Sequence, residues 1–254
     1  MKNWKTNFGL VLGGGFSIHL DWIPNDTEDK FIQHKLSMGD SKHIQMYDKH
    51  PIRYELNNYG FRTPDDFFNG DEGTVYLGCS HTFGTAHYLE NTWSYKLHQK
   101  VGEGKFFNIS CGSSGIASQY NLLKYFSDKL KIKKVYHFYP DECFFRYEFI
   151  DSNKKIKVFN LEDLPEEAQP FFIEYMFNDG YNSLHNLSYI DAIKNVCKEM
   201  GADYHIHTKS YRKLPIDAYS EDRIPARDLE HYYVDEHDEI VSEFLKLSNT
   251  KSLL

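Results

Sequence analysis

The sequence predicts an α/β protein, a three-layer α/β/α sandwich with a mostly parallel central sheet. From residue 73 onward, short apolar runs rich in β-branched and aromatic residues alternate with longer segments of helical period. This alternation is typical of parallel strands joined by helices that cover both faces of the sheet. The chain has 254 residues, 41% of them hydrophobic, which is enough for one sizeable core.

Each predicted element follows from the local pattern of the chain. The apolar runs are short and end at glycine, proline or polar residues, which favours strands. The intervening segments repeat large apolar residues every three or four positions, which favours helices, and one of them ends at Gly201, a typical C-terminal stop. The predicted strands are residues 74–79, 105–110, 134–140 and 203–208, and the predicted helices lie within residues 93–101, 120–130, 189–201 and 235–247.

Two regions do not follow this alternation. Residues 1–70 mix aromatic, glycine and charged residues without a clear period, and residues 144–186 are rich in Phe, Tyr and Glu, with a helical pattern in residues 164–177. The sequence contains neither an internal repeat nor a low-complexity linker. We therefore expect one domain over residues 1–254, with an N-terminal extension (about 1–70) and an insertion (about 144–186) that forms a wall of the substrate site.

Charge and hydropathy exclude two kinds of partner. The formal net charge is −8, whereas nucleic-acid binding requires a clustered basic surface. No run of about 18 apolar residues exists, so neither a membrane span nor a membrane partner is expected. Residues 8–18 have the length of a signal-peptide core, but three glycines interrupt them and no small-residue cleavage site follows. Four scattered cysteines without a CxxC pair indicate reduced thiols and a cytoplasmic protein.

Neither a cofactor nor a metal ion is expected. The glycine run in residues 12–17 lacks the GxGxxG spacing and is followed by no Walker lysine, so a turn is the simpler interpretation. His205 and His207 are two residues apart on a predicted strand, so their side chains share one face, but the sequence shows no third ligand at a spacing typical of metal sites. Cys79, Cys111 and Cys143 follow strands, where small apolar packing is the more ordinary role.

The ends of the predicted strands place polar residues at one edge of the sheet, and ligands of open parallel sheets bind at that edge. Ser80 follows the first strand, at a position where a helix could begin. A serine there is either an ordinary helix cap or a nucleophile near the positive end of the helix dipole. A nucleophilic serine needs a base, and the base needs an orienting acid. His231 and Asp228, three residues apart just before the last helix, can supply both.

These stretches resemble the sequence blocks of the SGNH (GDSL-like) hydrolases, particularly bacterial and phage-type members. "GCSHTFG" (78–84) resembles their first block, "NISCGSSG" (108–115) their second, and "ARDLEH" (226–231) their last, and "NNYGFR" (57–62) is similar to a lead-in of some members. The resemblance implies a flavodoxin-like sandwich with Ser80 as nucleophile, His231 as general base and then acid, and Asp228 as the residue that orients His231. It also implies an oxyanion hole formed by the amide of Ser80 and an amide of Gly112 or Ser113.

The chain departs from the family pattern at three places. Cys79 stands where the family usually has Asp before the serine. Ser113 stands where the second block has glycine, and the nearest glycines are at positions 112 and 115. The third block, G-x-N-D, is not recognisable, and Asp141 stands about where its Asn would lie. An ionised Asp only accepts hydrogen bonds, so we expect Asp141 to point away and backbone donors to form the oxyanion hole.

The resemblance predicts a serine esterase that hydrolyses an acyl ester, with acetyl as the first choice, on a small molecule or a glycan. Acyl transfer to a sugar by the same residues is one alternative. The other is a non-catalytic scaffold or virion-associated binding protein that retains the fold. Neither the acyl group nor the oligomeric state follows from the sequence.

Overall fold

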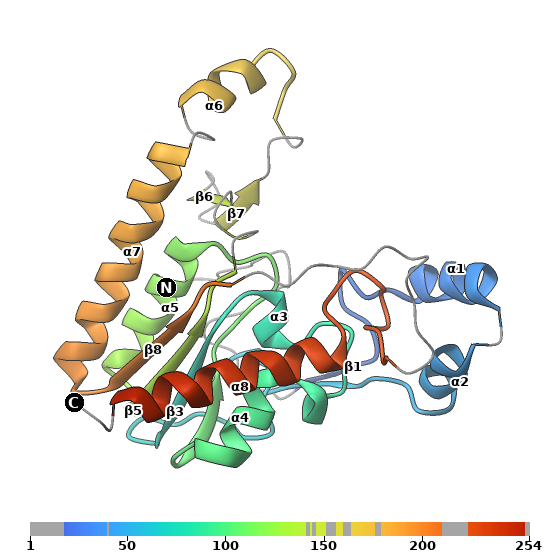
Figure 1. The fold of residues 1–254 in the computed structure, drawn as a ribbon, viewed down its shortest axis with the longest axis horizontal. Helices are drawn as coiled ribbons and strands as arrows, with labels where there is room; N and C mark the ends of the chain where they lie inside the picture. Colours follow the sequence, from blue (N-terminus) through green and yellow to red (C-terminus); the bar gives the residue numbers. More distant parts are fainter. Residues whose placement is uncertain are drawn as a thin grey trace.

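The computed structural model describes residues 18–39, 41–140, 143, 146–150, 156–159, 164–175, 179–209 and 223–251. A four-stranded parallel sheet forms its centre (Figure 1), made of β3 (Glu72–Gly78), β4 (Lys105–Asn108), β5 (Lys131–Phe138) and β8 (Asp203–His207). The spatial order is β4-β3-β5-β8, so the chain moves from β3 to β4 and then crosses to the other side of β3. Such a reversal marks the usual ligand site of an open α/β sheet, outside the carboxyl ends of the strands.

Helices cover both faces of this sheet, which confirms the predicted three-layer α/β/α sandwich. α4 (Trp93–Val101) contacts α8 (Val234–Lys251) on one face, and α5 (Ile116–Ser127) contacts α7 (Asp179–Met200) on the other. The alternation of side chains along β3 separates the two cores. Val75 and Leu77 pack in the cluster that includes α5 and α7, whereas Tyr76 packs in the cluster that includes Trp93 of α4 and Phe244 of α8.

The predicted strands and helices of this sandwich are all present, with shifted ends. The strand expected at 74–79 begins at Glu72, because Glu72 and Gly73 already pair with β5. The helix expected at 189–201 begins ten residues earlier, at Asp179, and its last two turns supply the buried Val196 and Cys197. A hydrophobic period marks only the packed part of a helix, so the less buried first turns of α7 carried no signal.

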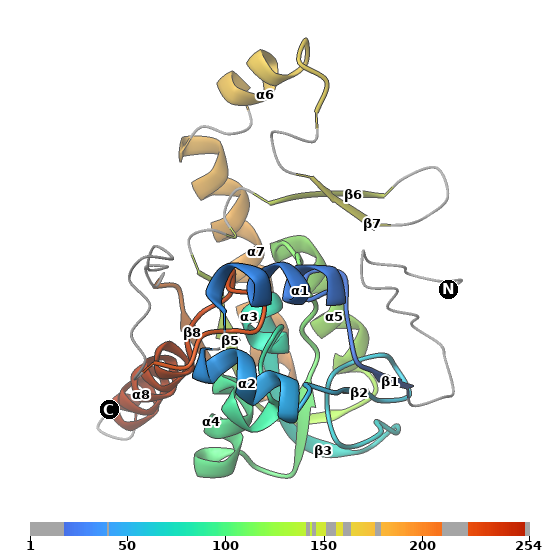
Figure 2. The same cartoon turned by 90° about the vertical axis from the view of Figure 1, so that its right-hand side faces the viewer.

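The N-terminal extension folds into elements that the sequence pattern did not reveal. They are β1 (Ile18–Leu20), α1 (Glu28–Met38), α2 (Lys42–Lys49) and β2 (Tyr54–Leu56), with β1 antiparallel to β2. Thr27 and Ser41 cap the two helices through their side-chain oxygens. This segment has its own small core, which includes Phe31, Tyr54 and also Phe83 from the central domain. Figures 1 and 2 show α1 and α2 beside the loop that leads into α8.

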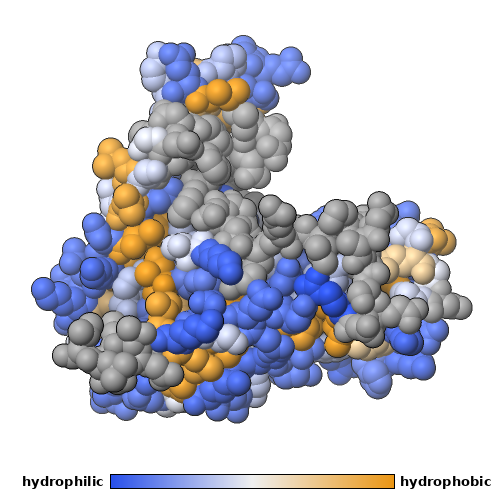
Figure 3. Space-filling model, viewed as in Figure 1, coloured by the Kyte–Doolittle hydropathy of each residue, from blue (hydrophilic) through white to orange (hydrophobic). Residues whose placement is uncertain are grey.

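The described part of the insertion lies beyond the carboxyl ends of the strands, as both views show (Figures 1 and 2). It contains the antiparallel strands β6 (Tyr147–Ile150) and β7 (Ile156–Phe159), which the sequence pattern did not predict, and α6 (Gln169–Tyr175), which lies within the predicted helical stretch. On the face drawn in Figure 3, apolar surface gathers along α7 and near α6, where Phe171, Leu184 and Leu187 are exposed. None of the helices in the described ranges is long and apolar enough to cross a membrane.

Candidate active site

Ser80 is the first residue of α3 (Ser80–Phe83), a single helical turn at the carboxyl end of β3. Cys79 is the cap residue, and its carbonyl oxygen accepts from the amides of Thr82 and Phe83, both at 3.0 Å. The Ser80 side chain therefore stands at the end of the strand, at the start of a helix, and the residue is 4% exposed. This is the strand-to-helix turn that the sequence predicted for the nucleophile.

Gly78 allows the chain to make this turn. Its φ is +156°, and a Cβ atom at this position would lie 2.1 Å from the Thr82 hydroxyl oxygen and 2.6 Å from the Phe138 carbonyl oxygen. Any larger residue would collide with both the helix and the neighbouring strand β5. The glycine of the first sequence block therefore has a steric explanation at the site itself.

Asp228 and His231 form a hydrogen-bonded pair in the loop before α8. The His231 Nδ1–H donates to Asp228 Oδ2 at 2.6 Å, and Asp228 Oδ1 accepts from the amides of Glu230 and His231 at 3.0 and 3.2 Å. Burial alone would raise the pKa of Asp228, but the charge and hydrogen bond of His231, together with the two amides, lower it to about 2. The carboxylate is thus ionised and fixes the proton on Nδ1, which leaves Nε2 as the acceptor of the neutral ring.

The loop that carries Asp228 and His231 contacts α3 through His81. The His81 ring stacks on Tyr232, with centroids 3.7 Å apart, and meets the His231 ring edge-on at 5.1 Å. The residue next to Ser80 therefore touches His231 itself. Within the described residues, no hydrogen bond joins the Ser80 hydroxyl to His231. The structure brings the two segments together, with the contact running through His81.

The loop after β4 carries Gly112 and Ser113, one of which was expected to supply an amide donor. The Ser114 hydroxyl donates to the Gly78 carbonyl oxygen at 3.0 Å, which ties this loop to the end of β3. Ser113 has φ +57°, in the left-handed region that glycine adopts most readily. A residue with a side chain adopts this conformation only uncommonly. Asn108, at the end of β4, donates from its side chain to the Thr82 carbonyl oxygen at 3.1 Å.

Asp141, the residue at the expected place of the third block, lies outside the described residues. Arg146 and Glu148, at the start of the insertion, both contact the segment around the first turn of α5. The Glu148 carboxylate accepts from the amides of Gly115 and Ser118 at 2.9 and 2.7 Å, so it caps α5. Burial raises the pKa of this carboxyl group. Arg146 Nη1 lies 3.4 Å from the Ser114 carbonyl oxygen, so the start of the insertion packs on the proposed oxyanion loop.

The cysteines at the strand ends are buried, in agreement with a packing role. Arg146 Nη1 lies 3.2 Å from Cys143 Sγ. Hydrogen bonding to Cys143 lowers the pKa of the Cys79 thiol against the opposing effect of burial, and the charges of His81 and Arg146 act in the same direction. Burial raises the pKa of Cys111 to about 12. Among the described residues, no group of three or more His, Cys, Asp or Glu side chains could hold a metal ion.

His205 and His207 do share one face of β8, as predicted, and they contact aromatic rings there. His205 stacks on Tyr136 with ring centroids 4.9 Å apart, and His207 meets Phe244 of α8 at 5.7 Å. Both imidazoles thus belong to the packing between the sheet and α8.

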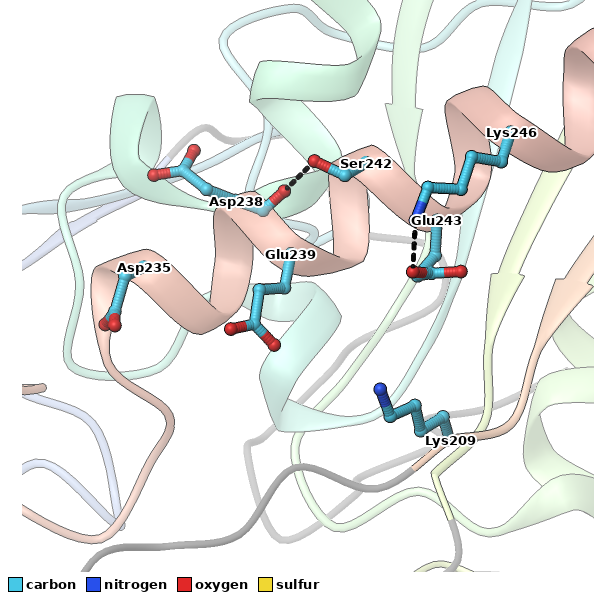
Figure 4. A pocket seen from close by; sticks show the side chains of 7 residues that line it. All are labelled: Lys209, Asp235, Asp238, Glu239, Ser242, Glu243 and Lys246. Carbon is cyan, nitrogen blue, oxygen red and sulfur yellow. Dashed lines mark hydrogen bonds and ion pairs between the residues drawn. The ribbon is translucent and has the colours of Figure 1, made fainter.

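A separate hollow of about 350 Å³ lies along α8 (Figure 4). Four carboxylates of this helix line it together with Lys209 and Lys246, and the Lys246 ammonium pairs with Glu243 at 2.9 Å. Neither Ser80 nor His231 lines this hollow. It is therefore distinct from the site at the strand ends.

The residues that hold the loop of Asp228 and His231 in place carry no signal in the sequence. His87 Nε2–H donates to the Tyr232 carbonyl oxygen at 2.6 Å, and Tyr47 donates to the Pro225 carbonyl oxygen at the same distance. Burial lowers the pKa of His87 to about 3, so its ring is neutral. These partners lie more than 100 positions from the loop in the sequence, and no local pattern connects them.

Comparison of the chain with known family models and with curated proteins finds no match in either set.

Proposed function

We propose that this protein is a serine ester hydrolase of the SGNH type, with Ser80, His231 and Asp228 as its catalytic residues. The observation that carries the proposal is the Asp228–His231 pair beside α3. An imidazole with its Nδ1 proton held by a buried carboxylate, next to a serine at a strand-to-helix turn, is the arrangement needed to activate a hydroxyl nucleophile. The order of the sequence blocks along the chain is independent support.

The proposed reaction follows from these positions. Ser80 Oγ attacks the ester carbonyl carbon while His231 Nε2 takes the hydroxyl proton, and the resulting imidazolium is stabilised by Asp228. The same proton then passes to the leaving alcohol, and water hydrolyses the acyl-serine in the reverse sense. The Ser80–His231 hydrogen bond forms in the substrate complex, since such bonds are often long in unliganded enzymes.

The oxyanion of the tetrahedral intermediate would bind the amide of Ser80 and an amide of Gly112 or Ser113. The tie between Ser114 and Gly78 keeps these two segments adjacent. Donors fixed before the reaction stabilise the developing charge without reorganisation, and each is worth about 3 kcal/mol. The acyl group that we propose is acetyl, carried by a small molecule or a glycan, and the insertion beyond the strand ends would contact the alcohol part.

Labelling with a fluorophosphonate probe, together with hydrolysis of a small aryl acetate, tests the proposal. We expect the purified protein to be labelled and active, and Ser80→Ala to lose both while remaining folded, since loss of a triad member costs several orders of magnitude in turnover. Ser94→Ala is the matched control: Ser94 is also buried and lies in the first turn of a helix, α4. It should keep both labelling and activity.

Two outcomes would contradict the proposal. If Ser80→Ala keeps more than a few per cent of the activity, Ser80 is not the nucleophile. If the folded wild-type protein is neither labelled nor active on aryl esters, the non-catalytic alternative is favoured.

A further inference from the structure

A closed ring of buried hydrogen bonds joins three segments around the candidate site. The Tyr54 hydroxyl of β2 donates to Asp26 Oδ2. Asp26 in turn accepts from the Arg227 guanidinium at 2.6 to 3.1 Å through three contacts. The Arg227 amide donates to the Ala86 carbonyl oxygen at 2.9 Å, and the Ala86 amide donates to the Tyr54 hydroxyl oxygen at 2.9 Å. Each of the four residues is therefore hydrogen-bonded to the next, and the last is bonded to the first.

Two members of this ring stand next to the proposed catalytic groups in the chain. Arg227 directly precedes Asp228, and Ala86 lies in the loop that leaves α3, six residues after Ser80. The other two members, Asp26 and Tyr54, belong to the N-terminal extension. The extension therefore holds the segment of the nucleophile and the segment of the acid–base pair against each other.

The ring is buried, and it includes a residue in an unusual backbone conformation. Asp26, Tyr54 and Ala86 are at most 1% exposed, Arg227 is 2% exposed, and both members of the ion pair have side chains that are 1% exposed. Ala86 has φ +62°, a conformation that an alanine holds only where its surroundings impose it. Both of its ring hydrogen bonds are made by backbone groups of this residue, so the ring supplies that constraint.

Neighbouring contacts support the same loops. Arg62 stacks over the Tyr54 ring at 4.5 Å and donates to the carbonyl oxygens of Gly84 and His87, on either side of Ala86. His34 Nδ1–H donates to the Arg227 carbonyl oxygen at 3.1 Å. Arg62 and His34 both belong to the N-terminal extension, which therefore holds the backbone on both sides of Ala86 and at Arg227.

We propose that Asp26 and Tyr54 are positioning residues for the catalytic site: through Arg227 and Ala86 they set the placement of Ser80 relative to His231. The inference rests on the proposed function. Being buried, neither side chain can touch a substrate, so their effect is on turnover and not on substrate binding. A displacement of about 1 Å between reacting groups can lower a rate by about a hundredfold, so even a small relaxation of the ring is measurable.

Tyr54→Phe tests this inference because it keeps the buried ion pair and removes only the two hydrogen bonds of the hydroxyl group. We expect kcat for a small aryl acetate to fall at least about tenfold, KM to stay within about twofold, and the rate of fluorophosphonate labelling to fall with kcat. Tyr88→Phe is the matched control: its hydroxyl donates to the His50 carbonyl oxygen, outside the ring, and kcat should stay unchanged. Arg227→Lys, which keeps the charge but not the three contacts to Asp26, should lower kcat in the same way.

A spectroscopic measurement separates positioning from a general loss of structure. The His231 Nδ1 proton that donates to Asp228 gives a proton NMR signal, identified by its loss in Asp228→Asn. It should persist in Tyr54→Phe, because that hydrogen bond lies within the loop and not within the ring. An unchanged kcat in both Tyr54→Phe and Arg227→Lys, or loss of the signal together with kcat, would overturn the inference. Ser80→Ala, assayed alongside, reports separately on the proposed function.

Discussion

Replacing Asp228 with Asn separates the electrostatic role of this carboxylate from its structural role. The asparagine oxygen can still accept from the amides of Glu230 and His231, so the loop should keep its shape. Its NH₂ group, however, would face His231 Nδ1, and the imidazole proton would move to Nε2. The ring could then no longer accept the serine proton, and kcat should fall about 10⁴-fold.

The pKa of Asp228 gives the size of the effect on stability. The pKa falls from its usual 3.8 to about 2 on folding, which corresponds to roughly 2 kcal/mol of unfolding free energy at neutral pH. A depressed pKa means that the unfolded chain binds the proton more tightly than the folded chain. This contribution is therefore complete above about pH 4 and is lost as the pH falls through about 2.

Urea unfolding at several pH values measures this contribution. At pH 7 the unfolding free energy of Asp228→Asn should be roughly 2 kcal/mol below that of the wild-type protein, and the difference should shrink toward pH 2. Asp238→Asn is the control: Asp238 pairs with Lys96 at the surface, and such pairs contribute at most about 1 kcal/mol. A difference that stays constant between pH 7 and pH 2, or a variant that keeps full kcat, would refute the reasoning.

Two other perturbations have outcomes that the structure determines. Burial lowers the pKa of His137 to about 3, so the folded protein keeps this ring neutral while the unfolded chain protonates it below about pH 6.5. This residue should therefore lower the unfolding free energy by roughly 1.4 kcal/mol per pH unit as the pH drops from 6.5 toward 3. Urea unfolding at pH 7 and pH 5 should show that His137→Gln loses less unfolding free energy between the two pH values than the wild type does. An equal loss in the two proteins would argue against a neutral buried ring. Gly78→Ala should destabilise the fold by about 3 kcal/mol or more, seen as a lower thermal midpoint, because its Cβ would meet Thr82 and Phe138. Gly70→Ala is the control: Gly70 has φ +89° but open space around it, so this variant should cost only about 1–2 kcal/mol. Equal midpoints for the two variants would contradict the steric argument.

Local patterns were enough to identify the central sheet and the three candidate catalytic residues. Strands and helices of the sandwich bury one or both faces, and this burial leaves a period in the sequence. Asp228 and His231 are three residues apart, so their contact is a local property of one loop, and Ser80 follows directly from a glycine that ends a strand. These features need no knowledge of the rest of the molecule.

Only the tertiary structure decided what surrounds these residues. Asp26 and Arg227 are separated by 201 positions, and Glu148 caps α5 from 33 residues downstream. Such pairs form because a buried charge or an uncapped helix end must find a partner wherever the fold brings one. Which residue becomes the partner depends on how the chain packs, so no spacing within the sequence marks it. The sequence by itself therefore indicated the candidate residues of the site, while the N-terminal extension, which has no readable period, acquired its place beside the loops that carry them only through folding.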